Sequence, residues 1–142
     1  MAVPNRHVIV SSRNGSLLNH IADDRGNAAW ADEPANKGGT GKGLTPFELI
    51  GAGLGACTSM TLIMYARHRN VDLRDVSVDI RYVRAGEAEN ARDVIERRID
   101  LVGPLDAEAV AKLGAIARRC PVFLMLDQAV DIADSVSLRE SV

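Results

Sequence analysis

The sequence predicts an α+β domain in which antiparallel strands surround one long apolar helix. Short strand-like segments separated by turn signals open the chain, and an uncharged run of eighteen residues follows at 49–66. Two alternating segments, a second helical segment and a last alternating segment complete the order strand-strand-strand-helix-strand-strand-helix-strand. This order lacks the repeated β-α-β units of a parallel nucleotide-binding sheet. The 142 residues suit one domain, residues 1–142, with an antiparallel sheet packed on a long buried helix.

The first three strands are predicted at 7–12, 17–22 and 28–31. Asn14-Gly15 separates the first two, and this dipeptide is the strongest short hairpin signal. A second turn at 24–27 precedes the third strand, so we expect an antiparallel meander. A glycine-rich loop at 33–44 follows it.

The central helix has a clear start signal. Thr45 suits the N-cap, Pro46 the first helical position and Glu48 the third, which together predict a capping box. The uncharged run is at the lower length limit for a membrane span. Glycines and hydroxyl side chains dilute its hydrophobicity, and the amphipathic strands on both sides need each other, so a core helix is favoured. Each glycine costs about 1 kcal/mol against alanine, which indicates close packing against the sheet or against another helix, including that of a second copy.

The second half of the chain predicts a hairpin and a helix. Strands at 76–83 and 95–101 alternate apolar and polar residues around a polar loop at 86–93. A helix is expected from Asp106 to about Arg119. A last alternating strand is expected at 130–138.

Composition and charge exclude several classes of partner. The net charge is −2, the sequence pI is about 5.9 and aromatic residues make up 4%, which argues against nucleic acid and against an anionic membrane surface. The N-terminal residues lack the pattern of a secretory signal, so a cytoplasmic protein with free thiols is expected. His7, His20 and His68 show no metal-ligand spacing.

Two cysteines are the candidate chemical groups. Cys57 lies midway along the central helix, and Cys120 ends the apolar face of the second helix just before Pro121, so both thiols are expected to face the interior. A thiolate can attack a peroxide to give a sulfenic acid, which a second thiol condenses to a disulfide. Buried cysteines also serve as inert small hydrophobic residues. The residues alone leave both interpretations open.

The segment 45–60, TPFELIGAGLGACTSM, closely resembles the central helix motif of the OsmC/Ohr family of osmotically inducible and organic hydroperoxide resistance proteins. Cys120-Pro121-Val122 resembles the second motif of that family. The resemblance implies an intertwined homodimer with active sites at the subunit interface. It implies that Cys57 is the peroxidatic cysteine, that Cys120 is the resolving cysteine and that organic hydroperoxides are reduced. It further implies an external dithiol such as protein-bound dihydrolipoamide as the reductant, and no bound metal or organic cofactor.

The charged residues of the motif depart from the family pattern. The family glutamate directly follows the proline, whereas here Phe47 does so and Glu48 comes one residue later. One residue turns about 100° around a helix, so Glu48 fits the capping box better than a catalytic pair. Arg13 resembles the family arginine that supports the thiolate. Weaker cationic candidates are Arg25, Lys37 and Lys42.

Three functions therefore follow as hypotheses. The first is a two-cysteine peroxidase for organic hydroperoxides, in which Cys57 attacks, Cys120 resolves and Arg13 supports the thiolate. The second is a non-enzymatic protein that binds a small apolar ligand in an interface cavity, which Phe47 in the charged position motivates. The third is a redox sensor that forms the Cys57–Cys120 disulfide without steady turnover.

Overall fold

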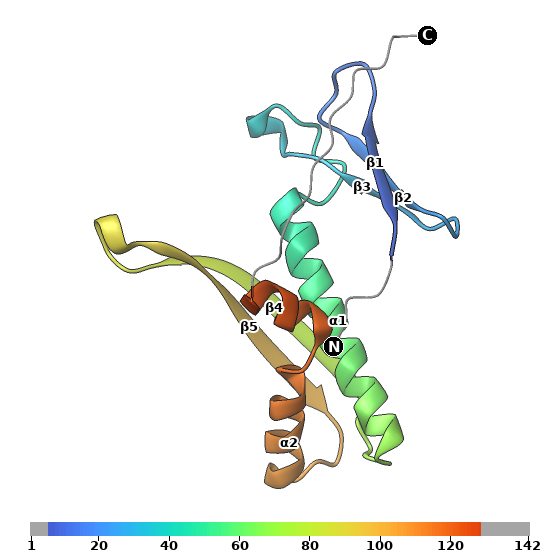
Figure 1. The fold of residues 1–142 in the computed structure, drawn as a ribbon, viewed down its shortest axis with the longest axis vertical. Helices are drawn as coiled ribbons and strands as arrows, with labels where there is room; N and C mark the ends of the chain where they lie inside the picture. Colours follow the sequence, from blue (N-terminus) through green and yellow to red (C-terminus); the bar gives the residue numbers. More distant parts are fainter. Residues whose placement is uncertain (1–5, 129–142) are drawn as a thin grey trace.

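The α+β class predicted from the sequence is confirmed by the computed structural model, which describes residues 6–128 (Figure 1). The strands are β1 (Val8–Ser12), β2 (Asn19–Asp23), β3 (Ala28–Ala31), β4 (Asp75–Ala85) and β5 (Arg92–Val102). The helices are α1 (Pro46–His68), α2 (Ala107–Ala117) and α3 (Pro121–Gln128), with single 3₁₀ turns at Ala35–Lys37 and Ala88–Asn90. The strand expected at 130–138 lies outside the described residues.

Within residues 6–128 the strands form two antiparallel sheets, where one sheet was expected from the sequence. Strands β1, β2 and β3 make the predicted meander, and β4 pairs with β5 as a separate hairpin. Asn14 and Gly15 in the first turn both have positive φ angles, of 55° and 69°, as a tight hairpin turn requires. Figure 1 shows the three-stranded sheet beyond the N-terminal end of α1, whereas the β4–β5 hairpin, α2 and α3 lie along the helix.

Helix α1 is the central element of the fold. Its capping box is formed as predicted, because Thr45 Oγ1 accepts from the Glu48 amide and Glu48 Oε1 accepts from the Thr45 amide. The helix is long and apolar enough to cross a membrane by length and composition. One face nevertheless packs inside the domain, since Leu54, Thr58 and Leu62 are buried there.

The opposite face of α1 is exposed in the single chain, so the helix is less buried than predicted. Met60 and Met64 are each 62% exposed, and the small residues Ala52, Gly53 and Ala56 lie exposed between the apolar positions. A contiguous apolar surface of this kind marks a binding face more often than free surface.

Gly51 and Gly55 let β4 approach the helix closely. A Cβ at Gly51 would lie 3.0 Å from Cγ2 of Ile80, and one at Gly55 would lie 3.6 Å from Cγ1 of the same residue. The predicted close packing of the helix glycines is therefore confirmed at these two positions. Gly53 faces open space within the chain.

The helix expected to run to about Arg119 ends at Ala117, and a further helix, α3, begins at Pro121. Proline lacks an N–H and disfavours helical geometry in the residue before it, yet suits the first position of a new helix. Cys120 lies in the break, where its carbonyl accepts from the Leu124 amide at 3.0 Å. The break places Cys120 directly at the start of α3.

The main apolar core joins α1 to α2 and the hairpin. Its buried members are Leu62, Leu113, Ile116 and Ala117, and partly buried side chains of β4, β5 and the adjoining loops pack around them. The core therefore fixes the middle of α1 against the end of α2. These are the two regions that carry the cysteines.

A buried carboxylate organises the loop before α1. Asp32 is 2% exposed and accepts hydrogen bonds from the amides of Glu33, Thr40 and Lys42 and from the Thr40 hydroxyl. The Thr40 hydroxyl is the largest of the influences that lower the pKa of Asp32 to about 2. The loop thereby returns Leu44 to β3, where its amide donates to the Trp30 carbonyl.

The first prediction concerns Asp32→Asn. A carboxylate whose pKa is about 2 in the folded state and 3.8 ordinarily stabilises the fold above pH 3.8, and this contribution is lost as the pH falls toward 2. We expect Asp32→Asn to melt at a lower temperature than the natural chain at neutral pH, and the difference to shrink as the pH approaches 2. Asp24→Asn in an exposed turn is the control. A constant difference across pH would contradict this role of Asp32.

The second prediction compares two helix glycines. Gly51→Leu would force a side chain into Ile80 and is expected to destabilise the protein by about 1–3 kcal/mol. Gly114→Ala in α2 meets nothing within 4 Å and is expected to stabilise it by about 0.5–1 kcal/mol. Urea denaturation of both variants tests the pair, and a stabilised Gly51→Leu would refute the close packing against β4.

Candidate active site

The fold brings the two cysteines together from distant parts of the chain. Cys57 comes from the middle of α1 and Cys120 from the break between α2 and α3, and the two thiols lie within hydrogen-bonding reach of each other. Both are free thiols. Cys120 is fully buried, whereas Cys57 is partly exposed. Cys57 is therefore the member of the pair that solvent or a small molecule can reach.

Opposing influences act on the Cys57 thiol. Burial raises its pKa most, and the hydrogen bond and the like charge of Cys120 raise it further. The Val122 amide and the Thr61 hydroxyl donate hydrogen bonds to the Cys57 sulfur and lower its pKa. The net direction is upward, so thiolate formation at neutral pH depends on every donor and cation that faces the sulfur.

The N-terminus of α3 supplies one of those donors. The first amides of a helix have no partner within the helix and carry partial positive charge. Val122 is the second residue of α3, and its amide points at the Cys57 sulfur. Pro121 at the first position lacks an N–H, so the Val122 amide is the first of the helix that can donate. Developing negative charge on Cys57 is therefore stabilised by this helix end.

Arg97 is a cation at the site that the sequence reasoning missed. Its Nη1 donates to Thr58 Oγ1 at 3.0 Å and to the Ala117 carbonyl at 3.1 Å. Its guanidinium carbon lies 4.7 Å from the centre of the Phe123 ring. Burial lowers the pKa of Arg97, while the charges of Cys120 and Cys57 raise it. A signal was present in the sequence, because position 97 lies on the same period-two face as Ile95, Ile99 and Leu101.

The structure separates Arg13 and Glu48 from the thiols within one chain. Arg13 lines a hollow of about 440 Å³ formed wholly by the β1–β3 sheet and its first turn, together with Trp30 and His20. Glu48 is engaged in the capping box, and its hydrogen bonds with Thr45 lower its pKa. The catalytic roles predicted for Arg13 and Glu48 remain predictions.

Phe47 occupies the position of the family glutamate and has a structural partner. The Tyr82 hydroxyl donates to the Phe47 carbonyl, and the two rings meet edge to face with centres 5.5 Å apart. These contacts hold the first turn of α1 against β4.

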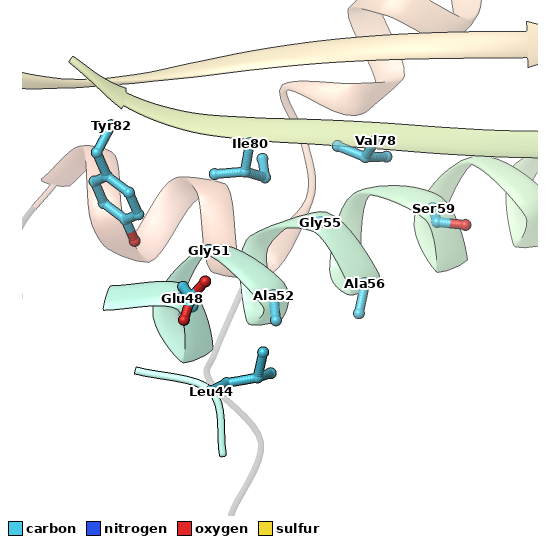
Figure 2. Close-up of a pocket in the computed structure, with 10 residues that line it drawn as sticks. All are labelled: Leu44, Glu48, Gly51, Ala52, Gly55, Ala56, Ser59, Val78, Ile80 and Tyr82. Atoms are coloured by element: carbon cyan, nitrogen blue, oxygen red, sulfur yellow. The ribbon is translucent and has the colours of Figure 1, made fainter. Parts of the chain in front are cut away.

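Two apolar hollows adjoin α1. One, of about 350 Å³, is lined by Leu54, Ile95, Phe123 and Leu126 together with Arg97, Asp93 and Asp127. Leu54 is three residues before Cys57 and Phe123 is three residues after Cys120, and neither cysteine lines this hollow. The other, of about 460 Å³, is lined by residues of α1 and β4 along the seam where they pack together. Figure 2 shows Ile80 and Val78 of β4 beside Gly51 and Gly55 of α1, with Leu44 and Glu48 at the N-terminal end of the helix.

Metal-binding groups do not gather in the described part of the chain. Within residues 6–128, no three side chains of His, Cys, Asp or Glu lie close enough to hold one metal ion.

Comparison with solved structures shows the same fold. An OsmC-like protein from Mycoplasma pneumoniae has a TM-score of 0.72 at 16% identity, covering 87% of this chain and 88% of that one. An organic hydroperoxide resistance protein OsmC from Legionella pneumophila has a TM-score of 0.65 at 21% identity, covering 89% and 91%. The organic hydroperoxide resistance protein OhrB of Bacillus subtilis has a TM-score of 0.61 at 22% identity, covering 92% and 96%. A search of curated proteins finds no match.

Sequence comparison adds the family to the fold. The profile described as "OsmC-like protein" matches residues 39–133, a span that includes Cys57 and Cys120 and covers more than half of the 142 residues. The resemblance inferred from the two cysteine motifs is thereby confirmed. The chain belongs to the OsmC-like protein family.

Proposed function

We propose that the protein is a two-cysteine peroxidase that reduces organic hydroperoxides. The observation that carries this proposal is the contact between the partly exposed Cys57 thiol and the buried Cys120 thiol at the N-terminus of α3. Two of the structural relatives are organic hydroperoxide resistance proteins, which supports the same chemistry here.

The proposed reaction balances on the two thiols. The Cys57 thiolate attacks the peroxide, so that an S–O bond forms, the O–O bond breaks and the leaving alkoxide takes a proton to become an alcohol. Cys57 is then a sulfenic acid. The Cys120 sulfur attacks it, a disulfide forms and water leaves. The peroxide has gained two electrons and the thiol pair has lost two, which an external dithiol returns by thiol–disulfide exchange.

The surroundings of the thiols favour an apolar hydroperoxide. The hollow of about 350 Å³ combines the apolar side chains of Leu54, Ile95, Phe123 and Leu126 with the charged side chains of Asp93, Arg97 and Asp127. Its apolar part would suit the carbon body of an organic peroxide. We further propose a dihydrolipoamide-type reductant, a cytoplasmic location that such a reductant implies, and no bound cofactor.

We also propose that the active form is a homodimer. Val8, Ile9 and Val10 of β1 are all more than half exposed, as are Met60 and Met64 on α1. A second copy packed on these surfaces would bury them, and burial of apolar surface contributes about 25 cal/mol per Å². A second chain would also allow the Arg13 of one copy to approach the thiol pair of the other.

The sensor and ligand-binding hypotheses predict different responses to peroxide and to ligand. A sensor would form the Cys57–Cys120 disulfide without steady turnover. A ligand-binding protein would use the apolar hollow between α1 and β4 and would respond to ligand when Cys57 is absent. Peroxide turnover that requires Cys57 separates the peroxidase from both.

The third prediction tests the reaction. Consumption of cumene hydroperoxide with dihydrolipoamide is expected to fall at least about a thousandfold in Cys57→Ser, because the attacking thiolate is removed. Cys120→Ser is expected to retain the first attack and to accumulate sulfenic acid, which a sulfenic acid trap would detect. Ser77→Ala changes an exposed residue of β4 and is the control for folding and activity. Turnover retained in Cys57→Ser would refute the peroxidase.

The fourth prediction tests the dimer. The double variant Met60→Glu/Met64→Glu places two charges on the exposed face of α1 and is expected to weaken a dimer formed there by at least about tenfold in Kd, or about 1.4 kcal/mol. Val110→Glu changes a comparably exposed apolar residue on α2 and is the matched control. Sedimentation velocity gives the result, and a natural chain that is monomeric at micromolar concentration would contradict the proposal.

A further inference from the structure

Arg97 has no part in the reaction scheme above, yet it touches both cysteine-bearing segments. We propose that Arg97 is the positioning residue that supplies positive charge to the thiol pair from within the same chain. The proposal rests on the proposed function for its catalytic consequence. Its direct test, the ionisation of Cys57, does not require peroxidase activity.

The hydrogen bonds of Arg97 hold its guanidinium between the two segments. One bond reaches Thr58, the residue after Cys57, and the other reaches the Ala117 carbonyl. That carbonyl also accepts from the Cys120 amide at 3.5 Å. Thr58 is fully buried and donates its own hydroxyl to the Leu54 carbonyl at 2.7 Å. The cation is thus anchored to the backbone of α1 and to the end of α2 at the same time.

No carboxylate neutralises Arg97 in the part of the chain that the structure describes. The salt bridges among residues 6–128 involve Arg25, Arg74, Arg81, Arg84 and Arg98, each on the surface. Arg97 differs from all of these because its hydrogen bonds go to a neutral hydroxyl and a carbonyl. Its charge is therefore available to groups across the site, and at partial burial a charge acts over a longer range than at the surface.

An aromatic ring fixes the position of this charge. Phe123 of α3 has Arg97 at 4.7 Å and Arg118 at 5.0 Å from its ring centre. Both distances suit cation–π contacts. Phe123 is three residues after Cys120, so the two guanidinium groups and the N-terminus of α3 concentrate positive charge around the thiols.

The remaining charged groups near Arg97 are two carboxylates. Asp93 of β5 and Asp127 of α3 line the hollow that Arg97 also lines. Asp93 is paired with Arg84 at 2.9 Å. The other titratable or charged groups at the site are Cys57 of α1, Arg118 at the end of α2 and Cys120 before α3.

This assignment differs from the one that the family resemblance suggested. Arg13 lines a hollow of the β1–β3 sheet, and its approach to a thiol needs a second chain. Arg97 reaches the cysteine segments without one. Arg97 therefore offers a cation to the thiol pair within a single chain.

The test measures the alkylation rate of Cys57 against pH in the fully reduced chain, with the labelled peptide identified by mass spectrometry. Arg97→Met is expected to move the profile to higher pH and to slow alkylation at neutral pH about tenfold, since loss of one nearby opposite charge costs on the order of one pKa unit. Arg97→Lys is expected to restore most of the rate. Arg98→Met removes a neighbouring exposed arginine that is paired with Asp100 and is expected to leave the profile unchanged.

Several outcomes decide the assignment. An unchanged Cys57 profile in folded Arg97→Met overturns it, as does a profile that moves only in Arg13→Met. If Arg97→Met does not fold, the comparison is made between Arg97→Lys and Arg97→Gln, which differ in charge at similar length. Equal Cys57 alkylation profiles in these two variants would overturn the assignment. A profile that shifts as expected in a chain without peroxide turnover supports the role of Arg97 and refutes the peroxidase.

Discussion

The contact between α1 and the start of α3 is the interaction on which the site depends. It brings the Cys57 sulfur to the Val122 amide and to the Cys120 thiol, and it exists because Pro121 ends one helix and starts another. A continuous helix through residue 120 would use the Val122 amide in its own hydrogen-bonding ladder. The break is therefore what leaves that donor free to face a sulfur.

At this contact, burial and polar neighbours have opposite effects on the pKa of the Cys57 thiol. Burial raises the pKa of the Cys57 thiol, although the side chain stays partly exposed. The Val122 amide and the Thr61 hydroxyl lower that pKa, and the role we propose for Arg97 is to lower it further. Reactivity at neutral pH is the balance of these influences, so small changes in the donors around Cys57 separate an active peroxidase from an inert member of the same fold.

Much of the architecture was predictable because its signals are local. The capping box at Thr45, the Asn14-Gly15 turn and the alternation along β4 each depend on residues within a few positions of one another. The end of α2 was predicted to within two residues, because Pro121 marks it in the sequence. The short helix α3 that begins at Pro121 was not predicted. The separation of the strands into two sheets depends on long-range packing, which local patterns do not encode.

The sequence predicted the two thiols of the candidate site, but it did not predict the arginine beside them. Cys57 and Cys120 lie in motifs whose residues are consecutive, so sequence resemblance identifies them. Arg97 is forty residues from one cysteine and twenty-three from the other, and only the register that pairs Ile80 with Arg97 places it on the face toward α1. The available signal was a charged residue between Ile95 and Ile99 on an apolar stretch of the strand face.

The most direct measurement of the central claim is the stoichiometry of a single turnover. Reduced protein would be mixed with one equivalent of an organic hydroperoxide in the absence of any reductant, and products would be measured by mass spectrometry. The account predicts one alcohol formed and one Cys57–Cys120 disulfide, seen as the loss of two hydrogens from a linked peptide pair. Intact peroxide with both thiols still free in a folded protein would contradict it.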